Sequence, residues 1–201
     1  MKPNFFLLMP LLILLSCKSR QVPLETQPEP EDGIFRIAFG SCNDTDRGNL
    51  LWDDILSLRP DLWIWGGDNV YADTDDMDKL RESYAALKAV PGYQALQAVT
   101  PVIGTWDDHD YGLNDGGAEF AARAGSQQAF LDFIGVPEES PRRNRAGVYA
   151  SHTFPVGKGS VKILVLDTRY FRSGLRADPE GTKRYVPHTE PGGTVLGEAQ
   201  W

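Results

Sequence analysis

The order of apolar and amphipathic segments constrains the fold of this chain most strongly. Short runs rich in bulky apolar residues predict strands, and they lie at 34–39, 61–65 and 101–106. The segments between them carry apolar residues at helical spacing, which predicts helices at 49–58, 76–90 and 93–99. Strands that alternate with helices are typical of a parallel sheet with helical crossovers, so the sequence predicts an α/β fold with stacked layers.

The second half of the chain has weaker patterns. Ser126 is placed to cap the start of a helix that would carry Phe130 and Phe133 on its apolar side. The segments 148–154 and 161–166 have strand composition, and the glycine-rich residues between them predict a hairpin turn.

The first 17 residues have the character of a targeting segment. Lys2 precedes an apolar run at 5–15, which is the length of a secretory signal and too short to span a bilayer comfortably. The run ends in Leu-Leu-Ser-Cys, which resembles a bacterial lipobox, so Cys17 is the predicted site of lipidation. The alternative is an ordinary signal peptide with an incidental cysteine. With the lipid attached, the protein would sit on the outer side of a membrane without spanning it.

Composition divides the rest of the chain into a tether and a folded domain. Residues 18–32 are polar and contain prolines, which predicts a flexible tether, and residues 33–201 are long enough for one folded domain. The chain has 20 basic and 28 acidic residues, giving a net charge of −8. Because no long basic stripe occurs, we expect no nucleic-acid-binding surface.

Ligand-type side chains follow the first two predicted strands. Cys42 follows the first, and Asp68 and Tyr71 follow the second, with two glycines allowing a sharp turn before Asp68. A thiolate and a phenolate suit a transition metal better than magnesium. If Cys17 carries lipid, Cys42 has no disulfide partner in the chain. The alternatives are a turn-forming role for Asp68 and simple packing for Tyr71.

A dense group of charged residues follows the third predicted strand. Asp107, Asp108, His109 and Asp110 stand in succession, and in a strand-to-loop transition their side chains would point apart. We therefore expect only one or two of the aspartates to reach a metal, and Asp108 is preferred. His109 would bind metal or lie near the substrate and protonate a leaving oxygen. A capping role is the alternative for Asp110.

Two further polar pairs have less specific patterns. Asp167 and Arg169 follow the last predicted strand on one side of the chain, and a buried ion pair between them is favoured over a phosphate clamp. Asn114 and Asp115 precede two glycines, and a simple turn is favoured over a loop that folds back on the site.

Several short segments together resemble one family. They read Phe-Gly-Ser-Cys-Asn, Gly-Asp-Asn-Val-Tyr-Ala-Asp, Trp-Asp-Asp-His-Asp-Tyr-Gly, Leu-Asp-Thr-Arg and Leu-Gly-Glu-Ala-Gln-Trp, at 39–43, 67–73, 106–112, 166–169 and 196–201. In this combination they resemble the PhoD-like (alkaline phosphatase D) family of the calcineurin-like metallophosphoesterases. The resemblance implies a four-layer α/β/β/α fold and hydrolysis of phosphate mono- or diesters.

The resemblance also implies cofactors and roles for individual residues. Better-known members use ferric iron with calcium, and their nucleophile is a metal-bound hydroxide or oxo group. Carried over to this chain, Cys42 and Tyr71 would bind the iron, and Asp68 would bridge the metals. Asp108 would take the place of a metal-binding asparagine. His109 would assist the transition state.

Two departures from the family pattern matter. Asn69 occupies a position that is sometimes arginine, and it is the residue expected there to contact the substrate phosphate. Further family ligands, in a Gly-Asp-x-His motif, would lie beyond Trp201, so we expect the chain to be an N-terminal fragment. The full expectation is a membrane-anchored extracytoplasmic phosphatase or phosphodiesterase acting on a phosphate ester. The alternative is a non-catalytic surface lipoprotein or an inactive truncated fragment.

Overall fold

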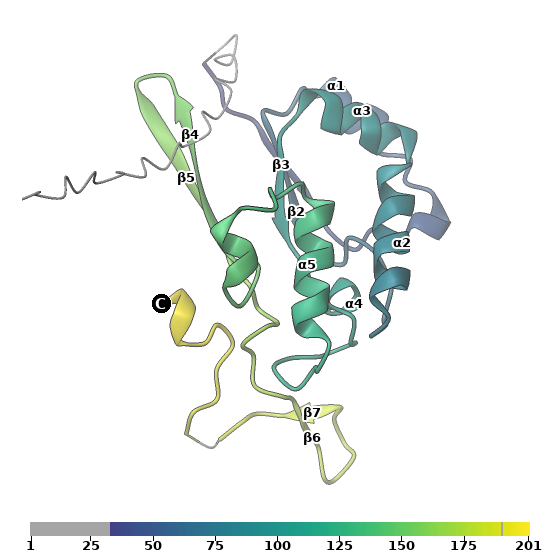
Figure 1. Cartoon of the computed structure of the whole chain (residues 1–201), viewed down its shortest axis with the longest axis vertical. Helices are drawn as coiled ribbons and strands as arrows, with labels where there is room; N and C mark the ends of the chain where they lie inside the picture. Colours follow the sequence, from purple (N-terminus) through teal and green to yellow (C-terminus); the bar gives the residue numbers. More distant parts are fainter. Residues whose placement is uncertain (1–32, 190) are drawn as a thin grey trace, which may run out of the picture.

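A three-stranded parallel sheet forms the centre of the computed structural model, which describes residues 33–189 and 191–201. The strands are adjacent in sequence order: β1 (Ile37–Gly40), β2 (Leu62–Gly66) and β3 (Val102–Thr105). Because all three run in the same direction, their carboxyl ends meet at one edge of the sheet (Figure 1). The expected signal segment, Cys17 and the tether lie outside the described residues.

Helices connect the strands and cover one face of the sheet (Figure 1). They are α1 (Trp52–Ser57), α2 (Met77–Lys88), α3 (Pro91–Val99), α4 (Asp108–Tyr111) and α5 (Arg123–Phe133). The start of α2 is capped by Asp76, whose carboxylate accepts hydrogen bonds from the N–H groups of Asp78 and Lys79. In the described residues, no helix is both long and apolar enough to cross a membrane.

Strand β2 is buried on both faces, and its side chains alternate between two cores. Trp63 and Trp65 point to the helices, where the Trp65 indole N–H donates to the Tyr93 hydroxyl over 2.9 Å. Leu62 and Ile64 point to the opposite face. This burial explains why the segment is an almost continuous apolar run.

An antiparallel hairpin packs against part of that opposite face. It consists of β4 (Ala150–Val156) and β5 (Gly159–Val165), and it contributes Phe154 and Val165 to the second core. The Thr105 hydroxyl donates to the Leu166 carbonyl over 2.9 Å, which ties the end of β3 to the end of β5. The described residues thus form three layers: helices, parallel sheet and hairpin (Figure 1).

A small projecting hairpin follows, which we call the β6–β7 arm (residues 176–186). Its strands are β6 (Arg176–Ala177) and β7 (Tyr185–Val186), and it lies near the end of the molecule that holds α4 (Figure 1). Three short 3₁₀ turns complete the described elements, at Thr45–Arg47, Pro141–Asn144 and Glu198–Gln200.

The α/β class and the expected order of strands and helices are confirmed. The expectation that Ser126 caps a helix is wrong, because α5 begins at Arg123 and Ser126 lies within it. The Ser126 hydroxyl is buried and points to the Met77 sulfur, 3.8 Å away. A serine inside a helix can look like a cap in sequence when the first turn lacks clear apolar spacing.

Candidate metal centre

Gly67 allows the ends of β2 and β3 to approach each other closely. Its φ is +108°, and a Cβ atom at this position would lie 2.6 Å from the Cβ of Asp107. Only glycine fits such a backbone and such a contact without displacement. The residues that follow the two strands, Asp68 and Asp108, are thereby placed side by side.

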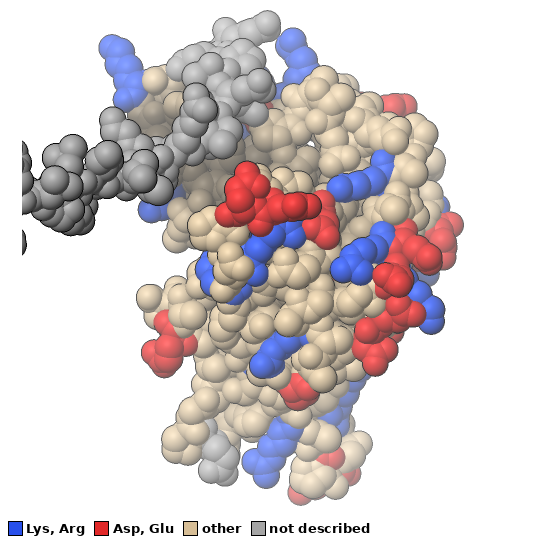
Figure 2. Space-filling view, in the orientation of Figure 1, with Lys and Arg blue, Asp and Glu red and all other residues tan. Residues whose placement is uncertain are grey.

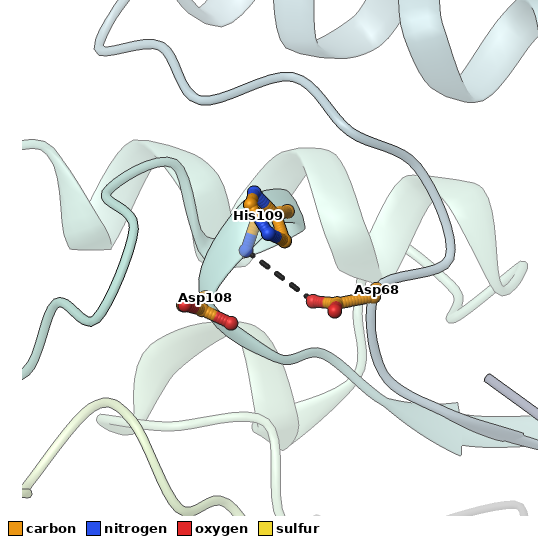
Figure 3. Close-up of side chains that lie close together, drawn as sticks. All are labelled: Asp68, Asp108 and His109. Carbon is orange, nitrogen blue, oxygen red and sulfur yellow. Dashed lines mark hydrogen bonds between the residues drawn. The ribbon is translucent and has the colours of Figure 1, made fainter. Parts of the chain in front are cut away.

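Asp68, Asp108 and His109 form a cluster at this edge of the sheet (Figure 3). Each offers one potential metal-ligand atom, and these atoms all lie within 4.8 Å of one another. Asp68 and Asp108 are each 8% exposed. The backbone N–H of His109 also donates to the Asp68 carboxylate over 3.4 Å.

The expected strand-to-loop transition at 107–110 is wrong. Asp108 begins the single-turn helix α4, and the Asp110 carboxylate caps it by accepting from the Asp107 N–H over 2.8 Å. In extended backbone, successive side chains would diverge, whereas a helical turn lets Asp108 and His109 both reach the cluster. The capping alternative for Asp110 is confirmed.

Cys42 and Tyr71 lie beside this cluster. The Cys42 sulfur is 3.7 Å from Asp68 Oδ2, and the Cys42 N–H donates to the Gly67 carbonyl over 3.2 Å. Partial burial raises the pKa of Tyr71 to about 12, and a hydrogen bond with the Cys42 side chain contributes to the rise. The Tyr71 ring lies 4.4 Å from the His109 ring, centroid to centroid. The structure therefore brings together the side chains expected at a metal centre.

Asn69 does not join this group. Its side chain is fully buried, and its amide N–H groups donate to Asp110 Oδ2 over 2.6 Å and to the Thr105 carbonyl over 2.9 Å. The amide faces the interior, between the end of β3 and the helix α4. Asn69 thus supports the backbone that carries Asp108, and the structure does not place it at the expected phosphate contact.

The surroundings shift the pKa values of the two carboxylates of the cluster in opposite directions. Burial raises the pKa of Asp68, and the neighbouring charges of Asp107 and Asp108 raise it further. Burial also acts to raise the pKa of Asp108, but the Asp115 N–H and the Arg169 charge outweigh it and lower that pKa. Crowded carboxylates of this kind are relieved when a cation binds between them.

A further acidic residue, Asp73, contacts His109, and the sequence pattern did not identify it. The His109 Nδ1 lies 2.7 Å from Asp73 Oδ2, which leaves Nε2 for another partner. Burial tends to lower the pKa of His109, but the hydrogen bond and charge of Asp73 raise it. Asp73 lies in the same family-like segment as Asp68, at 67–73, and this position could have marked it as a candidate site residue.

The partner that the sequence predicted for Arg169 is not the one that the structure shows. The Arg169 guanidinium pairs with Asp107, and with Asp108 over 3.4 Å, and not with Asp167. The Asp167 carboxylate instead accepts from the Trp106 indole over 2.9 Å and from the Val148 N–H over 2.8 Å. The predicted Asp167–Arg169 ion pair is therefore wrong, although both residues support the site.

The Asn114–Asp115 segment combines the two alternatives that the sequence left open, a simple turn and a loop that folds back on the site. It forms a turn, and that turn folds back so that the Asp115 N–H donates to Asp108 Oδ2 over 2.7 Å. The favoured interpretation, a turn alone, is incomplete. The presence of the two glycines after Asp115 indicated the turn but not what it would contact.

Several non-glycine residues around the cluster have left-handed backbone. Their φ angles are +54° at Cys42, +49° at Asp68, +43° at Asp73 and +56° at Asp115. Such conformations cost about 1 kcal/mol or more each, and less for Asp than for Cys. They persist where the surrounding structure imposes them, and they concentrate at functional sites.

The surface charges are mixed on the face shown in Figure 2. Lys and Arg side chains there are separated by Asp and Glu, and no continuous basic surface forms on that face.

Comparison with known families agrees with this geometry. A sequence model of one family, described as PhoD-like phosphatase, matches residues 37–201. The matched region includes every residue of the cluster. No curated protein matches the chain.

Proposed function

This chain belongs to the PhoD-like phosphatase family, and from that premise we propose that it hydrolyses phosphate mono- or diesters with the help of metal ions. The single observation that carries the proposal is the convergence of donor side chains from three separate strand ends. Cys42 comes from β1, Asp68 and Tyr71 from β2, and Asp108 from β3. Packing alone does not require a thiol, a phenol and carboxylates to meet at one sheet edge.

The donor set fits two different cations. A thiolate and a phenolate, as Cys42 and Tyr71 would supply, favour ferric iron. Carboxylate oxygens favour a hard ion such as calcium. Asp68 lies between the two groups, because one of its oxygens is 3.7 Å from the Cys42 sulfur and the carboxylate also belongs to the cluster with Asp108. We therefore propose that Asp68 would help to hold both cations, with Fe³⁺ and Ca²⁺ as the proposed ions.

The residues around the ions would have different roles in the reaction. When bound, the cations would polarise the phosphoryl oxygens and make a nucleophile available at neutral pH. His109 would hold a proton for the leaving oxygen, because Asp73 orients its ring and favours its charged form. Arg169 would hold Asp107 and Asp108 in place. We assign Asn69 to the support of α4 through Asp110.

The wider setting of the enzyme is part of the same proposal. A lipid on Cys17 would anchor the protein on the extracytoplasmic side of a membrane, as the first residues of the sequence suggest. A second helical layer would extend the three observed layers to the α/β/β/α sandwich that the family resemblance implies.

A hydrolysis assay of the metal-loaded chain tests the proposal. We expect cleavage of p-nitrophenyl phosphate or bis(p-nitrophenyl) phosphate after loading with iron and calcium. Cys42→Ala and Asp68→Asn should each lower kcat/KM by more than about 100-fold, since loss of even an outer-shell partner costs about 10–100-fold. The matched control is Asp53→Asn, which removes an exposed carboxylate on α1.

The results of this assay distinguish the proposed enzyme from the non-catalytic alternative. Full activity in both Cys42→Ala and Asp68→Asn would refute the proposed site. A folded, metal-loaded wild-type chain that cleaves neither ester would favour the alternative, a surface protein or fragment without catalytic activity.

A further inference from the structure

The β6–β7 arm contacts the body of the protein through Asp115. The Asp115 carboxylate accepts a hydrogen bond from the Tyr185 hydroxyl over 2.9 Å and pairs with Arg184 over 2.6 Å. Arg172, which precedes the arm, donates to the backbone carbonyls of Asp115 and Gly116. The side chain and carbonyl of Asp115 are thus both held by the segment that follows β5.

The other side of the same residue faces the metal cluster. The Asp115 N–H donates to Asp108 Oδ2 over 2.7 Å, while Arg169 reaches the other oxygen only at 3.4 Å. The Asp115 N–H therefore lies closer to the Asp108 carboxylate than the Arg169 guanidinium does. One residue connects the arm with a proposed metal ligand.

The turn that carries Asp115 has little freedom to adjust. Asp115 has φ +56°, a conformation that its side-chain contacts help to maintain. A Cβ on Gly116 would lie 2.6 Å from the Leu113 carbonyl, and one on Gly117 would lie 2.4 Å from the Arg172 carbonyl. Because the turn is packed this closely, we expect a change at the Asp115 side chain to shift the backbone N–H of Asp115.

We propose that the β6–β7 arm is a positioning element for Asp108 and that it acts through Asp115. It holds the N–H of Asp115 against one oxygen of Asp108, while Arg169 lies 3.4 Å from the other oxygen, and these two contacts fix the orientation of the carboxylate. Hydrogen bonds to ligating carboxylates orient them and strengthen metal binding. The inference rests on the proposed function, since it takes Asp108 to be a metal ligand.

The contacts predict an order of importance. Arg184 is 70% exposed, so its ion pair with Asp115 is screened and should contribute little. The Tyr185 hydroxyl is more sheltered, and its loss should matter more. Removal of the whole Asp115 side chain should have the largest effect, because the left-handed turn then loses both partners.

Cation titration of the full chain tests the proposal, with Mn²⁺ as the probe for the Asp108 side and electron paramagnetic resonance as the readout. We expect Asp115→Ala to raise the Kd for Mn²⁺ by about 10-fold or more, within the range typical of outer-shell changes. Tyr185→Phe should raise it less, and Asp115→Asn should retain most of the affinity because an amide can still accept from Tyr185. Tyr149→Phe is the matched control, since the Tyr149 hydroxyl makes no hydrogen bond within the described residues.

A second readout distinguishes positioning from general loss of structure. The visible absorption band of Fe³⁺ bound to Cys42 and Tyr71 should keep its position and intensity in Asp115→Ala and Tyr185→Phe. Unchanged Mn²⁺ affinity in both variants would overturn the inference while leaving the proposed function intact. Parallel loss of the iron band and of Mn²⁺ binding would also overturn it, because it would indicate a purely structural role. A wild-type chain that binds neither ion would overturn the proposed function and the inference together.

Discussion

Single residues decide whether the strand ends can form a site at all. The sequence identified Cys42, Asp68 and Asp108 because each lies a few residues past the end of a strand, and the carboxyl ends of parallel strands must meet. It could not identify the partner of Arg169. That partner depends on how the end of β5 lies against α4, which is a matter of packing between distant segments.

Gly67 gives a test at this scale. Gly67→Ala should lower the free energy of unfolding by about 2–4 kcal/mol, because it adds a steric clash of about 1–3 kcal/mol to the strain of positive φ. Gly135→Ala is the control, since Gly135 also has positive φ (+72°) but its added Cβ would meet nothing within 4 Å. Urea unfolding measures both variants. Equal destabilisation of the two would show that the contact with Asp107 is unimportant.

At the scale of elements, sequence patterns worked where burial is regular and failed where it is not. The apolar run of β2 and the helical spacing of apolar residues in α2 are clear patterns, and both elements were expected. The start of α5 was misplaced because its buried face includes polar residues, Ser126 and Gln127. The short helix α4 was missed because its capping contacts use the same aspartates that suggested metal binding.

The hairpin of β4 and β5 should make stability depend on pH through His152. Burial lowers the pKa of His152, and the nearby charge of Arg142 lowers it further. The unfolded chain therefore binds this proton more readily, and the protein should lose stability as the pH falls below about 6.5 towards the lowered pKa. In His152→Gln the difference between the unfolding free energies at pH 7.5 and pH 5 should be smaller than in the wild type. An identical difference would show that His152 does not contribute.

At the scale of the whole molecule, the family and the α/β class were readable because several motifs occur together in a fixed order. The contact between the β6–β7 arm and Asp115 was not readable. It joins residues about seventy positions apart by a hydrogen bond and an exposed ion pair, and neither leaves a periodic pattern. The layers of the molecule therefore follow from sequence patterns, whereas the fine orientation of the proposed metal ligands follows from their three-dimensional contacts.

The most direct measurement of the central claim is anomalous X-ray diffraction from crystals of the chain loaded with iron and calcium. Data collected at the iron absorption edge should show one strong peak within bonding distance of the Cys42 sulfur, the Asp68 carboxylate and the Tyr71 phenol oxygen. Density for a second cation should lie between Asp68 and Asp108. An iron peak elsewhere in the molecule, or loaded crystals with no peak beside Asp68, would contradict the account.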